Sequence, residues 1–145
     1  MTATAASLER EEGRVPYVYL DSLGFQTIGV GRLVDHRKGG RLTNPEIDFL
    51  LANDIAEKTA QVIAALPWAA SIDPVRLDVL VEMCFQLGIG SAAHGTGLLG
   101  FQHTLASVRD GRYAEAAASM LLSKWATSDS PARAHRMSTQ MATGV

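Results

Sequence analysis

Several features are absent from this chain of 145 residues, and their absence excludes some classes of protein before any motif is considered. It has a single cysteine, Cys84, so no disulfide can form within the chain. Its net charge is −2, whereas a general nucleic-acid binder normally carries a strongly basic face. No window approaches the roughly 18 to 20 unbroken apolar residues of a membrane span. We therefore expect no nucleic-acid partner and no stable membrane insertion.

Targeting and metal-binding patterns are also missing. The N-terminal stretch "MTATAASLEREEG" lacks the basic and then apolar segments of a secretory signal peptide, so we expect a soluble protein made in a cytosol. The four histidines, His36, His94, His103 and His135, show no metal-ligand spacing. The glycines between residues 88 and 100 lack the elements of a phosphate loop and predict a flexible helix connection. The sequence thus predicts neither a metal site nor a cofactor.

The composition that remains is that of an ordinary globular protein. Hydrophobic residues make up 47% of the chain and charged residues 19%. A chain of this length can bury about 70% of its unfolded surface, which is enough for a hydrophobic core. Length and composition together favour one compact domain.

The first thirty residues predict a short helix followed by a β-hairpin. In "SLEREEG", Ser7 is the expected N-cap of the helix and Gly13 its stop. Glu12 is then the last helical residue, beside the negative end of the helix dipole. From Pro16 to Gly31, β-favouring residues flank the turn signal "DSLG", which predicts two paired strands.

The rest of the chain is predicted to be helical. After a polar, basic loop, "DHRKGGR", Thr43 and Glu46 form a capping box that begins a long helix. Apolar residues at helical spacing continue it to about Leu66. Later capping and stop signals predict four more helices, which begin at Asp73-Pro74, near Phe101, near Arg112 and at Ser130-Pro131.

These elements predict an α+β fold that is mostly α, arranged as one domain over residues 1–145. We expect an N-terminal lobe with the β-hairpin at about 13–43 and a linker helix at about 44–66. A helical lobe is expected at about 67–145, and it should also include the N-terminal helix.

Three side chains in "EEGRVPYVYLDSLGFQTIGVGRL" are candidates for a catalytic site. Glycoside hydrolysis needs one carboxylic acid to protonate the leaving oxygen, and a second carboxylate to activate water or attack the sugar. Glu12 at a helix end suits the acid role, Asp21 in a hydrated turn suits the second role, and Thr27 could hold a water. The same residues also suit plain turn and capping roles, and on spacing alone that structural interpretation is favoured.

The stretch resembles the active-site segment of phage-type lysozymes, the T4 lysozyme family (glycoside hydrolase family 24). Glu12-Gly13, Asp21 and the "TIGVG" of residues 27–31 fall at the intervals of that family's pattern. Two later stretches, "VEMCFQLGIGSAAHGTGLLGFQHTL" and "EAAASMLLSKWATSDSPARAHR", are similar to further family motifs and follow in the same order. The resemblance therefore covers nearly the whole chain.

The resemblance implies a muramidase, which hydrolyses the β-1,4 bond between N-acetylmuramic acid and N-acetylglucosamine in bacterial peptidoglycan. Glu12 would be the general acid, and Asp21 with Thr27 would place and activate water on the opposite sugar face, giving inversion. Arg133 matches a family arginine that pairs with the catalytic glutamate. The residues that would line the sugar-binding cleft are Leu33, Phe85, Thr104 and Ser119.

Three departures from the family pattern stand out. Arg32 replaces the usual histidine after "TIGVG", and we expect this to affect stability more than activity. The segment between Arg32 and the linker helix is short, so the N-terminal lobe should be smaller. The chain also stops at Val145, short of the tail found in many relatives.

In biological terms the resemblance implies a monomeric, bacteriolytic endolysin of a phage or prophage. It would accumulate in the host cytoplasm and reach the periplasm and cell wall after a holin-type pore permeabilises the membrane. Alternatives are a lytic transglycosylase, which forms anhydro products, and a catalytically silent wall-binding or phage structural module. A secreted antibacterial toxin is a further possibility, although the sequence shows no delivery segment.

Overall fold

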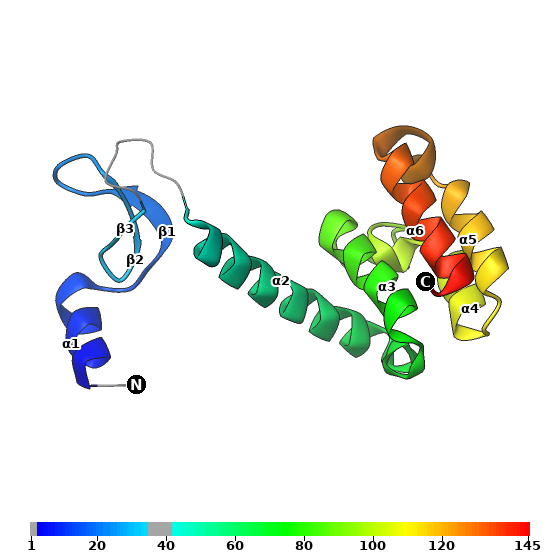
Figure 1. The fold of residues 1–145 in the computed structure, drawn as a ribbon, viewed down its shortest axis with the longest axis horizontal. Coiled ribbons are helices and arrows are strands. Elements are labelled where there is room, and N and C mark those ends of the chain that lie inside the picture. The colour runs from blue at the N-terminus through cyan, green and yellow to red at the C-terminus, as the bar shows by residue number, and fades with distance from the viewer. Residues whose placement is uncertain (1–2, 35–41) are drawn as a thin grey trace. The chain divides into compact units, whose positions relative to one another are not determined.

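The computed structural model describes residues 3–34 and 42–145 (Figure 1). They divide into two compact units, Met1–Leu50 and Leu51–Val145, and each unit is described by itself. The predicted basic loop "DHRKGGR" lies outside the described residues. The secondary structure is mostly helical with one small antiparallel sheet, which confirms the α+β prediction. The predicted lobe boundaries within one domain stay a prediction.

The N-terminal unit begins with helix α1, Ala3–Glu12. The prediction of Ser7 as the N-cap is wrong, because the preceding alanine-rich residues are strong helix formers and extend the helix backwards. The predicted end is confirmed: Glu12 is the last helical residue, and the backbone N–H of Gly13 donates to the carbonyl of Glu9 at 3.0 Å.

A three-stranded antiparallel sheet in the order β1-β2-β3 follows α1 (Figure 1). Strands β1, Val15–Leu20, and β2, Gln26–Gly29, form the predicted hairpin. The sequence did not predict β3, Arg32–Leu33, which is only two residues long and pairs with β2. Its shortness explains the omission, since two residues carry no readable alternation.

Helix α2, Asn44–Ala65, begins at the predicted capping box. The backbone N–H of Thr43 donates to Oε2 of Glu46 at 2.8 Å, and the Thr43 hydroxyl donates to the same oxygen at 2.7 Å. Near the other end of α2, Val62 is fully buried in the core of the C-terminal unit.

The C-terminal unit is a cluster of helices in which α5 packs against α4 and α6, and α6 also packs against α3 (Figure 1). Its elements are the 3-10 turn η1 Pro67–Ser71, α3 Pro74–Leu87, η2 Leu98–Gly100, α4 Gln102–Arg109, α5 Tyr113–Leu121, the π-helical turn η3 Trp125–Asp129, and α6 Pro131–Thr143. Asp73 caps α3 through the backbone N–H of Arg76, and Gly88 ends it, as predicted.

The stretch "RYAEAAASMLLSKW" predicts a helix from Arg112 to Trp125, but the observed helix α5 is shorter. It ends at Leu121, and the π-helical turn follows. The Ser123 hydroxyl donates to the Met120 carbonyl at 2.7 Å, while its oxygen accepts from the backbone N–H of Ala126 at 3.2 Å. Such local side-chain hydrogen bonds compete with regular helix bonding, which accounts for the break.

The hydrophobic core lies in the C-terminal unit. Its largest fully buried side chains include those of Leu80, Met83, Leu98, Met120, Met137 and Met141. Met137 and Met141 of the last helix therefore face the core. Cys84 is also buried, and this burial raises the pKa of its thiol, as expected for a small core residue.

Arg76 fastens the C-terminal end of α6 to α3. Its Nε donates to the Met141 carbonyl at 2.8 Å and its Nη2 to the Ala142 carbonyl at 3.1 Å. The same guanidinium pairs with Asp73 at 2.7 Å and lies 3.7 Å from the ring centroid of Tyr113. One side chain thus holds both the start of α3 and the end of α6.

Candidate active site

The predicted general acid, Glu12, lies at the C-terminal end of α1 and against the turn between β2 and β3. An added Cβ at Gly31 would lie 2.6 Å from Oε2 of Glu12, so it would push this carboxyl group aside. Gly31 also has a φ of +59°, a conformation that other residues rarely adopt. The carboxyl group therefore rests on bare backbone, and glycine at position 31 leaves the room for it.

Asp21, the predicted second carboxylate, sits in the turn of the hairpin and is half-buried. Its Oδ1 accepts hydrogen bonds from the backbone N–H groups of Leu23 and Phe25, each at 2.9 Å. The turn role that the sequence also suggested is therefore real. It occupies one oxygen, and within the described residues no hydrogen bond uses Oδ2.

Thr27 lies in the central strand β2, opposite Tyr19 on β1 and Leu33 on β3. Its side chain is only 4% exposed, and its hydroxyl donates to the Phe25 carbonyl at 3.3 Å. This contact fixes the direction of the hydroxyl group. The N-terminal unit thus carries four of the predicted site residues on one helix end and one small sheet.

The C-terminal unit carries the other predicted substrate-binding residues. Phe85 on α3 is 48% exposed, so its ring is accessible to a ligand. Thr104 on α4 is only 1% exposed, and its hydroxyl donates to the Ser119 hydroxyl on α5 at 3.0 Å. Thr104 and Ser119 therefore hold two helices together, and their contact with sugar stays a prediction.

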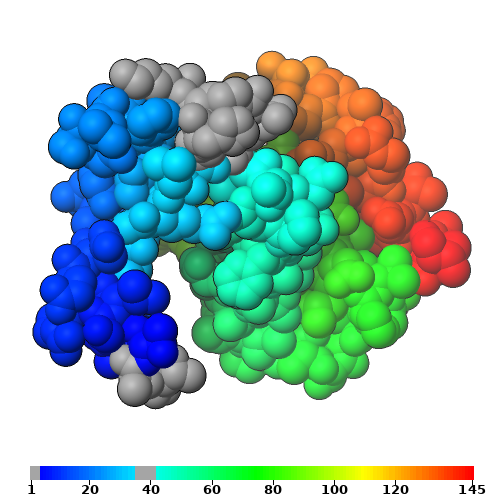
Figure 2. Space-filling model, turned by 60° about the vertical axis from the view of Figure 1, so that its left-hand side comes forward, coloured from blue at the N-terminus to red at the C-terminus, as the bar shows by residue number. Residues whose placement is uncertain are grey.

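Arg133, in the first turn of α6, is exposed and lines a cavity of about 560 Å³. The helices α3 and α6, which contribute its walls, pack against each other and form neighbouring parts of one surface (Figure 2). Arg136 and Glu82 also line this cavity, so it combines two guanidinium groups with one carboxylate. The pairing of Arg133 with Glu12 joins residues of different units and stays a prediction.

A hydrogen-bonded chain fixes the segment before Arg133. The indole Nε1 of Trp125 donates to Oε1 of Gln86 at 3.0 Å, and Nε2 of Gln86 donates to the Ser130 hydroxyl at 2.7 Å. Ser130 directly precedes α6. Gln86 therefore ties α3 to the start of α6, a role that sequence reasoning missed, although a polar residue within an apolar run is its signal.

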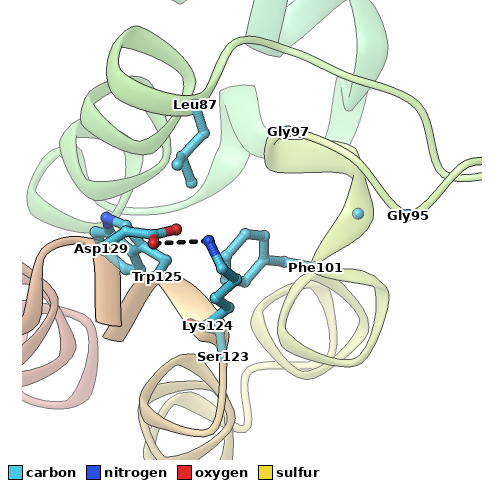
Figure 3. Close-up of a pocket in the computed structure, with 9 residues that line it drawn as sticks. Leu87, Gly95, Gly97, Phe101, Ser123, Lys124, Trp125 and Asp129 are labelled. Carbon is cyan, nitrogen blue, oxygen red and sulfur yellow. Dashed lines mark hydrogen bonds and ion pairs between the residues drawn. The ribbon is translucent and has the colours of Figure 1, made fainter. Parts of the chain in front are cut away.

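A second cavity, of about 320 Å³, lies within the C-terminal unit and contains none of the predicted site residues (Figure 3). Phe101 and Trp125 both line it and meet edge to face, with ring centroids 6.1 Å apart. Lys124 and Asp129 form an ion pair of 2.8 Å beside them. Trp125 itself is buried and belongs to the hydrophobic core.

The glycine-rich connection that borders this cavity is tightly packed. The expectation of a flexible connection is contradicted by its packing, because an added Cβ at Gly90 would lie 1.9 Å from the Thr96 carbonyl oxygen. Ser91 and Thr96 also exchange backbone hydrogen bonds at 3.0 and 3.1 Å. The glycines permit close backbone contact here.

Residues 3–34 and 42–145 contain neither a metal-binding cluster nor a membrane-spanning helix. None of the described His, Cys, Asp and Glu side chains form a group of three or more suited to holding a metal ion. Within the same ranges, no helix has the length and apolar character needed to cross a membrane.

Comparison with known proteins gives a consistent result. The family model of phage lysozyme matches residues 9–138, a range that includes all the predicted site residues. A protein of Dictyostelium discoideum named "Probable T4-type lysozyme 1" is 25% identical to this chain over 165 residues. That alignment covers 95% of this chain and 92% of the relative. The chain therefore belongs to the phage lysozyme family and is a peptidoglycan hydrolase of the muramidase type.

Proposed function

We propose that the protein cleaves the β-1,4 bond between N-acetylmuramic acid and N-acetylglucosamine. The observation that carries this proposal is the close fit of the Glu12 carboxyl group on Gly31, in the same unit as Asp21 and Thr27. Gly31 has no side chain and so leaves room for this carboxyl group.

In the proposed reaction, Glu12 donates its proton to the glycosidic oxygen as the bond to the leaving sugar breaks. A water molecule attacks the anomeric carbon from the opposite face, and Asp21 accepts its proton through Oδ2. Thr27 helps to place this water. Direct attack by water from that face inverts the anomeric configuration.

Further residues have proposed roles in binding and positioning. Arg133 pairs with Glu12 and holds the carboxyl group in position between turnovers. The sugar-binding cleft is lined by Leu33, Phe85, Thr104 and Ser119. Exposure of the Phe85 ring supports a role in contacting sugar, while the Thr104–Ser119 hydrogen bond supports a role in shaping the cleft wall.

We also propose a biological role as a phage or prophage endolysin for host lysis. The protein is made in the host cytoplasm as a monomer and reaches the peptidoglycan once a holin-type pore opens the membrane. Expression in a Gram-negative host, with and without a co-expressed pore-former, tests this role. Lysis that needs the pore supports the proposal, and lysis without it contradicts the dependence.

The reaction is tested by digesting purified Gram-negative peptidoglycan and weighing the released fragments by mass spectrometry. Fragments with hydrated, reducing muramic-acid ends, absent with Glu12→Gln, support the proposed muramidase. Anhydro ends would assign the protein to the lytic transglycosylases and leave Asp21 without its role. No fragments from folded protein would favour a silent wall-binding module.

Inversion needs a separate measurement, because fragment masses are the same for both stereochemical outcomes. Proton NMR of a digestion followed from its first minutes records the anomer that forms before mutarotation. The α-anomer as first product supports inversion of the β-linkage. The β-anomer would instead indicate retention and a covalent intermediate.

A further inference from the structure

We propose that Arg32 is a positioning residue for Glu12, and that it acts through an ion pair with Glu46 and the backbone of Gly31. The inference rests on the proposed role of Glu12 as the general acid. It assigns a purpose to Arg32, the residue that directly follows Gly31.

The Glu12 carboxyl group, at the end of α1, lies against the turn that follows β2. The chain leaves α1 at Glu12 and enters β1 at Val15, which pairs with Gly29 on β2. The carboxyl group of Glu12 then lies against Gly31, where a Cβ would displace it. The position of this carboxyl group therefore depends on where the turn after β2 lies.

The turn between β2 and β3 is held by a very short strand. Gly31 is followed directly by β3, whose two residues pair with Ile28 and Thr27 of β2. A strand of two residues makes few backbone hydrogen bonds and resists displacement poorly. An additional side-chain anchor at Arg32, the residue next to Gly31, therefore has a large influence on the turn.

The side-chain anchor of this turn is the ion pair between Arg32 and Glu46. Nη2 of Arg32 forms an ion pair with Oε1 of Glu46 in the first turn of α2. The other oxygen of Glu46 accepts two hydrogen bonds from Thr43, at 2.8 and 2.7 Å. The Glu46 side chain is 22% exposed, against 59% for Arg32, so the better-buried partner is also the one already fixed. Arg32 thus links the turn to an oriented carboxylate.

These contacts form a continuous path inside the N-terminal unit, from Thr43 through Glu46 and Arg32 to Gly31 and Glu12. An ion pair as exposed as this one contributes little to global stability. Its removal should therefore affect the placement of Glu12, and hence the rate, more than it affects folding.

The test compares Arg32→Gln, Glu46→Gln and the double variant in hydrolysis of soluble, uncross-linked peptidoglycan fragments. Glutamine at position 46 keeps the acceptor that the capping box needs, while it removes the charge. We expect each single variant to lower kcat about fivefold with KM within about twofold, since binding groups are untouched. The double variant should be no slower than the slower single variant, because all three lack the same link.

Two further variants separate positioning from general damage. Arg32→Lys keeps a cation and should recover part of the lost rate. Arg109→Gln removes an exposed arginine that pairs with Asp110 in the C-terminal unit and should leave kcat unchanged. Melting temperatures of all variants should agree within a few degrees. If Arg32→Gln does not fold, Arg32→Lys and Glu46→Gln support the same comparison.

Several results would overturn the proposal. Single variants with wild-type kcat would show that the ion pair has no influence on Glu12. Effects that multiply in the double variant would show that Arg32 and Glu46 act separately. A rate loss that follows the loss of folded protein would assign the pair a purely structural role.

A measurement without substrate distinguishes failure of this inference from failure of the proposed function. In protein labelled with ¹³C at glutamate carboxyl groups, the Glu12 resonance is assigned by its absence from Glu12→Gln. Arg32→Gln and Glu46→Gln should both shift this resonance, and Arg109→Gln should not. An unshifted resonance contradicts the positioning role even if the enzyme is active, whereas a shifted one supports it even if no fragments are released.

Discussion

The N-terminal and C-terminal units hold their side chains in place by different means. In the C-terminal unit, large apolar residues of α3, α5 and α6 fill a continuous core. In the N-terminal unit, the predicted catalytic residues are held by backbone contacts: a turn hydrogen-bonded to Asp21, a strand that carries Thr27, and a glycine that faces Glu12. The positions of these predicted catalytic side chains therefore depend on hydrogen bonds and steric fit more than on buried apolar surface.

This difference implies that stability and catalysis can be changed separately. A substitution in the core should unfold the protein without altering the chemistry of the molecules that remain folded. A substitution around Gly31 should alter the chemistry while most of the free energy of unfolding is kept. The predictions below test this separation, from the largest expected effect to the smallest.

The largest effect should come from Glu12→Gln. The amide keeps the shape of the side chain but cannot donate the proton, and loss of a general acid typically costs about 10² to 10⁴ in rate. We expect kcat to fall by about a thousandfold, with the urea midpoint unchanged, because Glu12 is an exposed residue at a helix end. Substantial residual hydrolysis would show that another group donates the proton.

The opposite behaviour is expected for Leu80→Ala. Leu80 is fully buried in α3, and truncation of a core leucine costs about 2 to 5 kcal/mol of unfolding free energy. Urea denaturation followed by circular dichroism measures this loss. At low temperature, where the variant is still folded, kcat per folded molecule should match wild type. A large drop in kcat there would contradict the separation of the two units.

Gly31→Ala should reduce activity strongly and stability modestly. The new Cβ would collide with the Glu12 carboxyl group, and we expect kcat to fall about 10- to 100-fold as that group is displaced. Gly29→Ala is the matched control, because Gly29 also has a positive φ, +70°, but open space around its Cβ position. Both variants should lose a similar unfolding free energy, about 1 kcal/mol, and only Gly31→Ala should lose most of its rate.

Sequence reasoning succeeded where the signal lies within a few residues. The capping pair Thr43 and Glu46 predicts the start of α2, and Asp73-Pro74 with Gly88 predicts both ends of α3. These are local hydrogen-bonding patterns that the chain carries with it. The site residues Glu12, Asp21 and Thr27 were found through a family motif, and their spacing alone also suited turn roles.

Contacts between distant residues could not be predicted in this way. Arg76 donates to a carbonyl 65 residues along the chain, and Trp125 to a side chain 39 residues away. Nothing near Arg32 in the sequence indicates that it pairs with Glu46. Such partners are chosen by the packing of whole elements, which no local pattern encodes.

Removal of the Arg76 side-chain contacts should have an intermediate effect on stability. Arg76→Met keeps the aliphatic stem but leaves the last carbonyls of α6 without their donors, which should cost about 1 to 3 kcal/mol of unfolding free energy. Urea denaturation measures it, with Arg109→Gln as the exposed control. A change below about 0.5 kcal/mol would show that water replaces the guanidinium at little cost.

The smallest effect should appear only in acid, at Asp73. Burial alone would raise the pKa of this carboxyl group, but hydrogen bonds from Arg76 and its charge outweigh burial and hold the pKa below the ordinary value. A lowered folded pKa means that the unfolded chain binds the proton more readily. The stabilisation is therefore complete above the ordinary aspartate pKa of about 3.9 and is lost as the pH falls through the folded value.

In Asp73→Asn this part of the acid dependence should disappear, so the difference in unfolding free energy from wild type should shrink between about pH 5 and pH 3. A difference that stays constant over this range would assign the role of Asp73 to helix capping alone.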